Sequence, residues 1–417
     1  MNSSQQAIHA QINSGLLSAI CFLLPFMQTI RSVPFLSYVI AILILNWIIS
    51  GKIFSSFSSL TRNLPAVLLL SLYLLYLLGL ISTENEANAV RQLLTKLPLI
   101  IFPMIISTSS FTRKQLDNCL KWFVLGCISA ALVIMGVAGY SKLLHGGNKF
   151  YYVLLSSPLH MHPSYLASFF ITAVVVTIHF IYDSKNKFIS RSNLFAIVII
   201  CFLTISVILL SARAQVIALL SISIAYSAAI AIRLKQYLLA LSVPLILFLS
   251  LLVTYQTSES VRFRFEKGFD EIMNFGNPID KNHFAGRAEV WQASSEVVSE
   301  HFWMGVGTGD VSDAMNEKYL GEEFKYALEK NFNAHNQFLQ TWMALGVGGF
   351  VLLLMIFAIP FYLAVRKKVF PAMAFLGLMF ISFQTESMLE AQSGTVFFCL
   401  FFSLFAVYMK DEKIKDS

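Results

Sequence analysis

About twelve apolar runs, joined by short polar connections, dominate this 417-residue chain. A hydrocarbon layer about 30 Å thick is crossed by a helix of about 20 residues, and each run approaches or exceeds that length. Barrel strands would instead alternate apolar and polar residues over about ten positions, and these runs do not alternate. The sequence therefore predicts an all-α integral membrane protein with about 12 transmembrane helices, near residues 15–31, 34–50, 65–81, 92–108, 116–140, 164–182, 192–210, 214–232, 236–255, 336–362, 370–386 and 393–409.

Composition excludes an ordinary soluble domain. Hydrophobic residues make up 57% of the chain and charged residues only 13%, whereas soluble domains carry about 25% charged residues. The first 14 residues lack the basic start and cleavage site of a removable signal peptide, so we expect the first span to stay in the protein. The five cysteines lie in or beside apolar runs without metal-ligand spacing, and we expect neither a metal nor a cofactor.

Lysine and arginine gather in alternate connections, which indicates that these connections face the cytoplasm. Both termini are then cytoplasmic, and the long segment near 256–336 lies outside. The formal charge of +7 has this topological cause and does not indicate a nucleic-acid partner. We therefore expect nine spans within 1–255, an external helical segment at 256–336, and three spans with a cytoplasmic tail at 337–417.

The external segment contains its own helical patterns. An interfacial helix is predicted over 260–275 and a second helix over 287–301, where apolar residues recur on one face. The glycine-rich stretch 305–309 predicts a turn, and polar helices are expected within 311–330. Asn333 is then the expected N-cap of a helix that begins near Ala334 and continues into the membrane.

This N-cap would place His335 in the first helical turn, at the membrane face. The partial positive charge of a helix N-terminus disfavours the imidazolium form, so we expect a neutral imidazole. Such a ring can accept a proton from a hydroxyl nucleophile within hydrogen-bonding reach. The alternative is an interfacial histidine that hydrogen-bonds a nearby carbonyl.

Two arginines point to anion binding beside the outer lipid headgroups. Arg213 lies between two apolar runs with almost no loop, and a guanidinium there is costly unless it is paired. Together with Arg287 from the external segment, it could form a cationic pocket suited to a diphosphate. The alternatives are that Arg213 reaches to phosphates of the membrane lipids, and that Arg287 pairs with Glu289 or Glu296.

Further basic residues are weaker candidates for the same pocket. Arg91 and Lys96 come from the outer end of the fourth predicted span and would join the two arginines if the helices converge. Arg262 and Arg264 follow the ninth span. For these two residues, simple contacts with the membrane surface are the favoured interpretation.

Glu386 and Glu390 are spaced one helical turn apart at the outer end of the eleventh predicted span. Either could pair with an arginine or orient an acceptor hydroxyl, and pairing is the favoured interpretation. His162 precedes Pro163, a typical helix-entry residue, at the start of the sixth span. A sugar-facing role for His162 or Tyr165 is the alternative.

The ordered motifs resemble those of the O-antigen ligase and polymerase superfamily; they are Ser211-Ala-Arg213, Gly286-Arg287-Ala-Glu-Val-Trp291, Gly305-Val-Gly-Thr-Gly309, Ala334-His335-Asn336 and Gly346-Val-Gly-Gly349. The resemblance implies a C-type glycosyltransferase fold in the bacterial inner membrane, with a metal-independent site that faces the periplasm. The family's essential histidine matches His335 and its two arginines match Arg213 and Arg287. Arg91 and Glu386 match less securely.

The resemblance also implies a reaction. Arg213 and Arg287 would hold the diphosphate of an undecaprenyl-diphosphate-linked glycan donor, while His335 deprotonates an acceptor hydroxyl for an inverting displacement. Ligation onto the lipid A core oligosaccharide is favoured. An O-antigen polymerase and a protein O-oligosaccharyltransferase use the same donor and remain alternatives. A lipid-linked glycan transporter is less consistent with the sequence, because charged residues are nearly absent from the span centres and no repeat is found.

Overall fold

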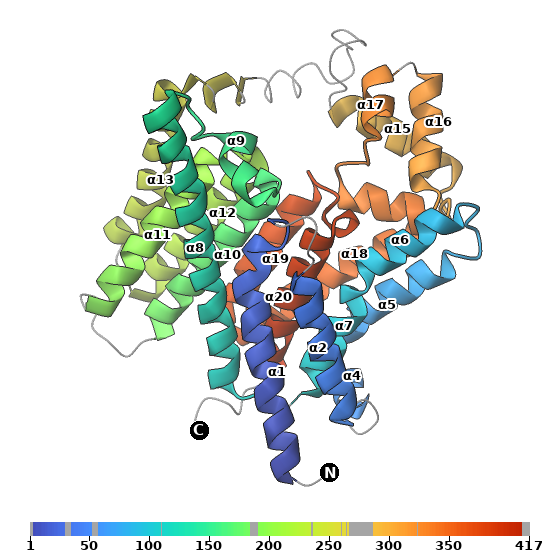
Figure 1. The fold of residues 1–417 in the computed structure, drawn as a ribbon, viewed down its shortest axis with the longest axis horizontal. Helices are drawn as coiled ribbons and strands as arrows, with labels where there is room; N and C mark the ends of the chain where they lie inside the picture. The colour runs from blue at the N-terminus through green and yellow to red at the C-terminus, as the bar shows by residue number, and fades with distance from the viewer. Residues whose placement is uncertain are drawn as a thin grey trace.

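The computed structural model describes residues 3–29, 35–51, 57–109, 111–183, 191–234, 237–259, 261–263, 265–266, 287–322 and 324–410. Over these residues the fold is all-helical, with 84% helix and no strand, which confirms the predicted all-α class. Its helices, shown in Figure 1, are α1 (Ser3–Leu23), α2 (Phe35–Ile49), α4 (Phe57–Thr61), α5 (Leu64–Leu78), α6 (Glu86–Lys96), α7 (Pro98–Thr108), α8 (Arg113–His145), α9 (Tyr152–Ser156), α10 (Pro163–Asp183), α11 (Arg191–Leu209), α12 (Arg213–Leu234), α13 (Tyr237–Thr257), α15 (Arg287–Glu300), α16 (Val311–Gly321), α17 (Lys325–Lys330), α18 (Gln337–Lys367), α19 (Phe370–Phe383) and α20 (Gln392–Lys410).

The predicted apolar spans coincide with helices. Among the described residues, six helices are long and apolar enough to cross a membrane. Six shorter apolar helices fall on the remaining predicted runs, so every run has a helical counterpart while the count of twelve spans stays a prediction. The six long candidates are Ala7–Phe26, Glu86–Thr108, Arg113–His145, Pro163–Tyr182, Gln337–Lys367 and Gln392–Met409.

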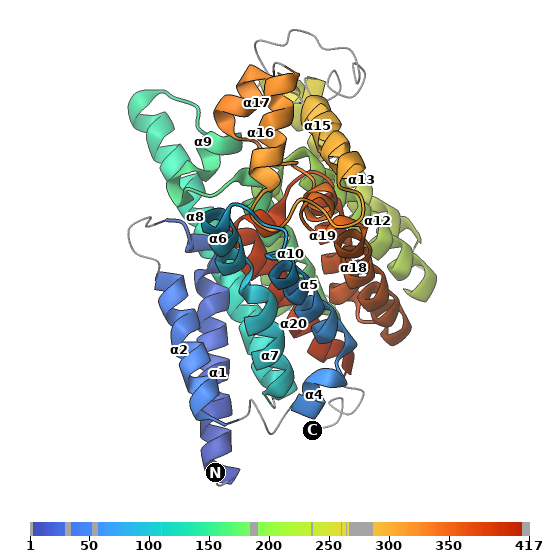
Figure 2. The same cartoon turned by 90° about the vertical axis from the view of Figure 1, so that its right-hand side faces the viewer.

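Helix α20 forms the centre of the bundle. Its apolar window is 89% buried, more than that of any other long apolar helix described. Phenylalanine rings supply most of this packing, because Phe397, Phe398 and Phe401 are fully buried and lie against Phe375 of α19 and Phe123 of α8. The polar helices α15, α16 and α17 lie at the upper end of this core in Figures 1 and 2. Helix α1 begins at the opposite, lower end.

The helix predicted over 287–301 is present as α15, and the polar helices expected within 311–330 are α16 and α17. The interfacial helix predicted over 260–275 lies largely outside the described residues.

Helix α18 is interrupted at Gly346, where the backbone adopts φ 66° and ψ −166°. The interruption frees helical hydrogen-bonding groups, and the loop after α15 satisfies them. The Val306 N–H donates to the Met343 carbonyl at 2.7 Å, and the Val347 N–H donates to the Phe302 carbonyl at 2.9 Å. Because unpaired backbone groups are costly at membrane depth, this exchange fixes the loop against α18.

The same loop is also fixed to the turn between α5 and α6. The Thr308 hydroxyl donates to the Tyr76 carbonyl at 2.6 Å. The Asp310 carboxylate accepts hydrogen bonds from the backbone N–H groups of Glu84 and Asn85, at 2.9 and 2.8 Å. The polar helices α15 and α16 are thereby attached to both α18 and the N-terminal helices.

Replacing Gly346 with alanine tests this attachment. An added Cβ would collide with the Trp303 carbonyl, and the backbone conformation is one that only glycine adopts readily. We expect Gly346→Ala to lower stability by about 2–3 kcal/mol, measured as a reduced melting temperature in detergent. Gly348→Ala is the matched control, because a Cβ there meets nothing within 4 Å and the residue is helical. Equal melting temperatures for the two variants would contradict the proposed role of the interruption.

Candidate functional site

A turn between α19 and α20 carries Glu386. Helix α19 ends at Phe383, so the predicted span 370–386 is too long and Glu386 lies beyond the helix rather than in its last turn. Gln337 at the start of α18 holds this turn by accepting a hydrogen bond from the Leu389 N–H at 2.7 Å. Thr395 of α20 donates to the Leu389 carbonyl at 3.1 Å.

The Glu386 carboxylate joins three other segments of the chain. Its Oε1 accepts a hydrogen bond from the Ser164 hydroxyl at 3.2 Å and lies 3.5 Å from a terminal guanidinium nitrogen of Arg287. Its Oε2 lies 3.5 Å from Nδ1 of His335. With only 10% of its side chain exposed, Glu386 is a buried acid surrounded by donors and cationic groups.

The surroundings of Glu386 keep it ionised. Burial alone would raise the pKa of this carboxyl above its ordinary value of 4.5. The hydrogen bond with His335 and the electrostatic attraction of His162, His335 and Arg287 outweigh burial, so the pKa of Glu386 is lowered. Glu386 is therefore a carboxylate at neutral pH.

Arg213 and Arg287 line one cavity with Glu386. Helix α12 begins at Arg213, directly after a tight junction in which Ser211 adopts a left-handed backbone with φ 49°. Helix α15 begins at Arg287. The two helix starts place Arg213 and Arg287 on the wall of a small cavity of about 30 Å³, which Ser164 and Glu386 also line.

His335 lies outside the helix in which it was predicted. Asn336 is the N-cap of α18, since its Oδ1 accepts hydrogen bonds from the Phe338 and Leu339 N–H groups at 2.9 and 3.2 Å. The prediction of Asn333 as the cap was wrong, and so the argument from the first helical turn does not apply. His335 instead adopts a left-handed backbone, with φ 44°, and donates its N–H to Asn333 Oδ1 at 3.0 Å.

The position of Glu386 orients the His335 ring. A carboxylate beside Nδ1 favours the tautomer with its proton on Nδ1, which leaves the Nε2 lone pair available. Among the described residues, none forms a hydrogen bond with Nε2. The edge of the ring packs against Phe332, with centroids 5.3 Å apart.

Arg91 and Lys96 do not join the two arginines, which corrects the wider cationic pocket predicted from the sequence. Lys96 is buried and pairs with Glu390, with Nζ and Oε1 3.0 Å apart. Arg91 lines a separate cavity. Arg264 lies outside the described residues.

His162 has the helix-entry position that Pro163 suggested. Its Nδ1 accepts a hydrogen bond from the Ser164 N–H at 3.4 Å, and its ring meets the edges of Tyr152 and Tyr165. Ser164, which follows in the first turn of α10, was missed by the sequence analysis. A serine directly after a helix-entry proline was the available signal.

A family model described as O-antigen ligase matches residues 195–354, a segment that contains Arg213, Arg287 and His335. This central part of the chain is similar to the O-antigen ligase family. An uncharacterized protein of Haemophilus influenzae is 23% identical over 363 residues, which cover 82% of this chain and 85% of that protein. O-antigen ligases are glycosyltransferase-type enzymes. The six long apolar helices found among the described residues indicate that the protein is a membrane protein.

Substituting Glu386 with glutamine tests the electrostatics of this site. Removing one partner of a buried ion pair costs about 3–5 kcal/mol, and we expect a value toward the lower end because Arg287 is partly exposed. Since the folded-state pKa of Glu386 is below 4.5, the stability advantage of the wild type should be complete above pH 4.5 and shrink as the pH falls through that lowered value. Melting temperatures of both proteins between pH 3 and 8 measure this difference. A difference in melting temperature that does not change with pH would contradict the assignment of Glu386 as an ionised, paired carboxylate.

Proposed function

We propose that this protein transfers a glycan from undecaprenyl diphosphate to a sugar hydroxyl of the lipid A core oligosaccharide. The supporting observation is that Arg287 and His335 both contact the Glu386 carboxylate and that Arg213 lines the same cavity as Glu386. All three residues lie in the segment that matches the O-antigen ligase model. In the proposed orientation the segment 256–336 faces the periplasm, both termini are cytoplasmic, and the inner membrane holds the remaining helices. The alternation of basic connections supports this orientation.

The two arginines are suited to the leaving group of this reaction. When the glycosidic bond breaks, its electron pair stays on the diphosphate, and nearby fixed cations stabilise that charge. Guanidinium groups bind phosphate oxygens through two parallel hydrogen bonds. Arg213 also stands at the first position of α12, where the helix N-terminus favours an anion.

Donor binding requires the cavity to widen. A volume of about 30 Å³ holds no diphosphate, and Arg287 is held by Glu386 in this structure. A phosphate oxygen replaces Glu386 as the partner of Arg287, so that the guanidinium exchanges one anion for another. The donor thus enters by moving the start of α15 relative to the α19–α20 turn.

His335 serves as the general base in this proposal. Its Nε2 accepts the proton of the acceptor hydroxyl while the hydroxyl oxygen forms a bond to the anomeric carbon. The bond between that carbon and the phosphate oxygen breaks, and the configuration is inverted. The Glu386 carboxylate beside Nδ1 stabilises the imidazolium that forms.

Substitution of the three proposed residues tests the function. We expect Arg213→Ala, Arg287→Ala and His335→Ala each to slow transfer about 100- to 1000-fold, because each removes about 2.7–4 kcal/mol of transition-state stabilisation. Product formation from purified lipid-linked donor and lipid A core, with a chelator present, measures the effect. Arg366→Ala at the far end of α18 and His301→Ala, an exposed histidine after α15, are the controls.

Four results would contradict the proposal. Wild-type activity in His335→Ala excludes this residue as the base, and a need for added divalent cations excludes the metal-independent mechanism. Extension of the glycan on its own carrier, or transfer to a protein hydroxyl, in place of lipid A core would identify a polymerase or a protein O-oligosaccharyltransferase. Movement of the intact donor across vesicles with no covalent product would identify a transporter.

A further inference from the structure

A second cavity lies beside the α19–α20 turn, on α6, α16 and α18. Its volume is about 240 Å³, and it shares no lining residue with the cavity of Arg213 and Arg287. Glu386 lines the first cavity and Glu390 lines the second. The two cavities therefore both adjoin the short α19–α20 turn that carries these glutamates. We call it the α6 cavity.

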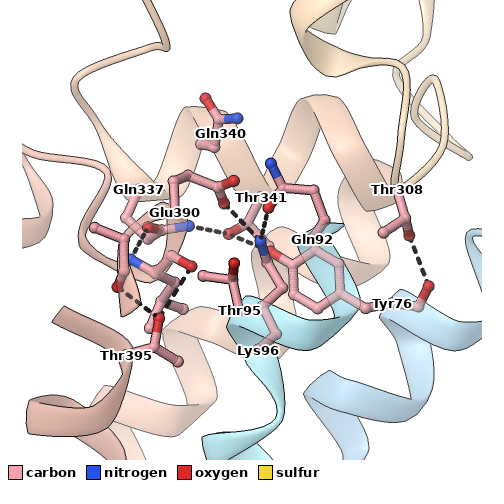
Figure 3. A network of polar contacts seen from close by, with 12 residues as sticks. Tyr76, Gln92, Thr95, Lys96, Thr308, Gln337, Gln340, Thr341, Glu390 and Thr395 are labelled. Atoms are coloured by element: carbon pink, nitrogen blue, oxygen red, sulfur yellow. Dashed lines mark hydrogen bonds and ion pairs between the residues drawn. The ribbon is translucent and has the colours of Figure 1, made fainter. Parts of the chain in front are cut away.

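The floor of the α6 cavity is polar but electrically balanced. Lys96, with 1% of its side chain exposed, lies 3.0 Å from Glu390 Oε1 and donates a hydrogen bond to Gln92 Oε1 at 2.7 Å. The ammonium group also lies 4.7 Å from the centre of the Tyr76 ring. Figure 3 shows Lys96 in the middle of this network, between Gln92 and Glu390. The buried cation is thus neutralised by protein groups.

Several polar groups on the walls retain unused hydrogen-bonding capacity. Gln340 is only 5% exposed, and its Oε1 accepts a hydrogen bond from the Ala334 N–H at 3.1 Å. Its amide nitrogen forms no hydrogen bond with any described residue. Asn333 uses its Oδ1 for the His335 N–H, and only one of the two Glu390 carboxylate oxygens contacts Lys96. The cavity therefore offers both donors and acceptors to a ligand.

This chemistry fits a sugar better than a phosphate. A sugar hydroxyl both donates and accepts hydrogen bonds, and it pairs with amide nitrogens and a carboxylate oxygen together. Arg91 on the wall adds a guanidinium donor for a sugar hydroxyl, and the Glu390 carboxylate accepts from a hydroxyl but repels a phosphate oxygen. Phe332 adds an apolar ring to the wall, suited to the C–H face of a pyranose. The volume of about 240 Å³ accommodates a monosaccharide unit.

We propose that the α6 cavity binds the sugar unit of the acceptor that carries the reacting hydroxyl. This inference rests on the proposed glycan transfer. Asn333 supplies the connection, because it lines the α6 cavity and also holds the His335 backbone. An inverting displacement needs the acceptor and the leaving group on opposite sides of the anomeric carbon. Two separate cavities beside one short turn, one lined by Glu386 and the other by Glu390, would hold the leaving group and the acceptor apart.

Filling the α6 cavity tests the inference. Thr95 lines the cavity, and its hydroxyl bonds only the Arg91 carbonyl within the same helix, so Thr95→Trp occupies space without removing a contact of the site. The matched control is Val90→Trp, a 56% exposed position of α6 that does not line the cavity. The measurement is the KM for purified lipid A core oligosaccharide and, separately, the KM for undecaprenyl-diphosphate-linked glycan.

We expect Thr95→Trp to raise the acceptor KM at least about tenfold, the loss expected for one or two sugar hydrogen bonds. The donor KM and kcat should stay within about twofold of wild type, as expected when only ground-state acceptor binding is lost. Gln340→Glu is the second variant and is decisive if the tryptophan variant does not fold. It keeps the oxygen that accepts from Ala334 but loses the free amide nitrogen, so it too should raise only the acceptor KM.

Two outcomes overturn the inference and are distinguishable. If wild type transfers glycan to lipid A core while Gln340→Glu and a folded Thr95→Trp leave the acceptor KM unchanged, or raise the donor KM equally, the α6 cavity is not the acceptor subsite. If wild type transfers nothing to this acceptor, the proposed function fails together with the inference.

Discussion

The ionised Glu386 carboxylate is the interaction on which the site depends. A buried charge must be paired, and the partners of Glu386 come from the start of α10, the start of α15 and the loop before α18. Satisfying one carboxylate therefore fixes the relative positions of Ser164, Arg287 and His335. In the proposed mechanism, the same pairing is the one that Arg287 exchanges for a phosphate, and Glu386 beside Nδ1 orients the His335 ring with Nε2 available.

The scaffold below this carboxylate depends on an interrupted helix. Helix α18 breaks at Gly346, and the loop after α15 supplies the hydrogen bonds that the break leaves open. This arrangement ties α15, which carries Arg287, to α18, whose N-terminus follows His335. Backbone pairing of this kind is rigid, because its loss would leave polar groups unpaired inside the bundle. The site is thus attached to the core by the same loop that contains the glycine-rich motif.

The sequence predicted the helices well, because apolar run length alone determines where a span forms. It also predicted Arg213, Arg287 and His335 as site residues through ordered motifs; the structure brings Arg287 and His335 to Glu386, and their roles stay predictions. The pairing of Lys96 with Glu390 was not predictable, since 294 residues separate the partners and only tertiary packing brings them together. The capping error has a local cause: Asn333 and Asn336 are equally good N-caps, and α18 begins after the second.

The central claim is that Arg213 and Arg287 hold the donor diphosphate beside His335. The most direct measurement is a cryo-electron microscopy map of the wild-type protein with undecaprenyl diphosphate, the product that retains the phosphates. The account predicts diphosphate density between the two guanidinium groups, with Arg287 moved away from Glu386. Diphosphate density at another place, with Arg287 still paired to Glu386 at the 3.5 Å seen here, would contradict it.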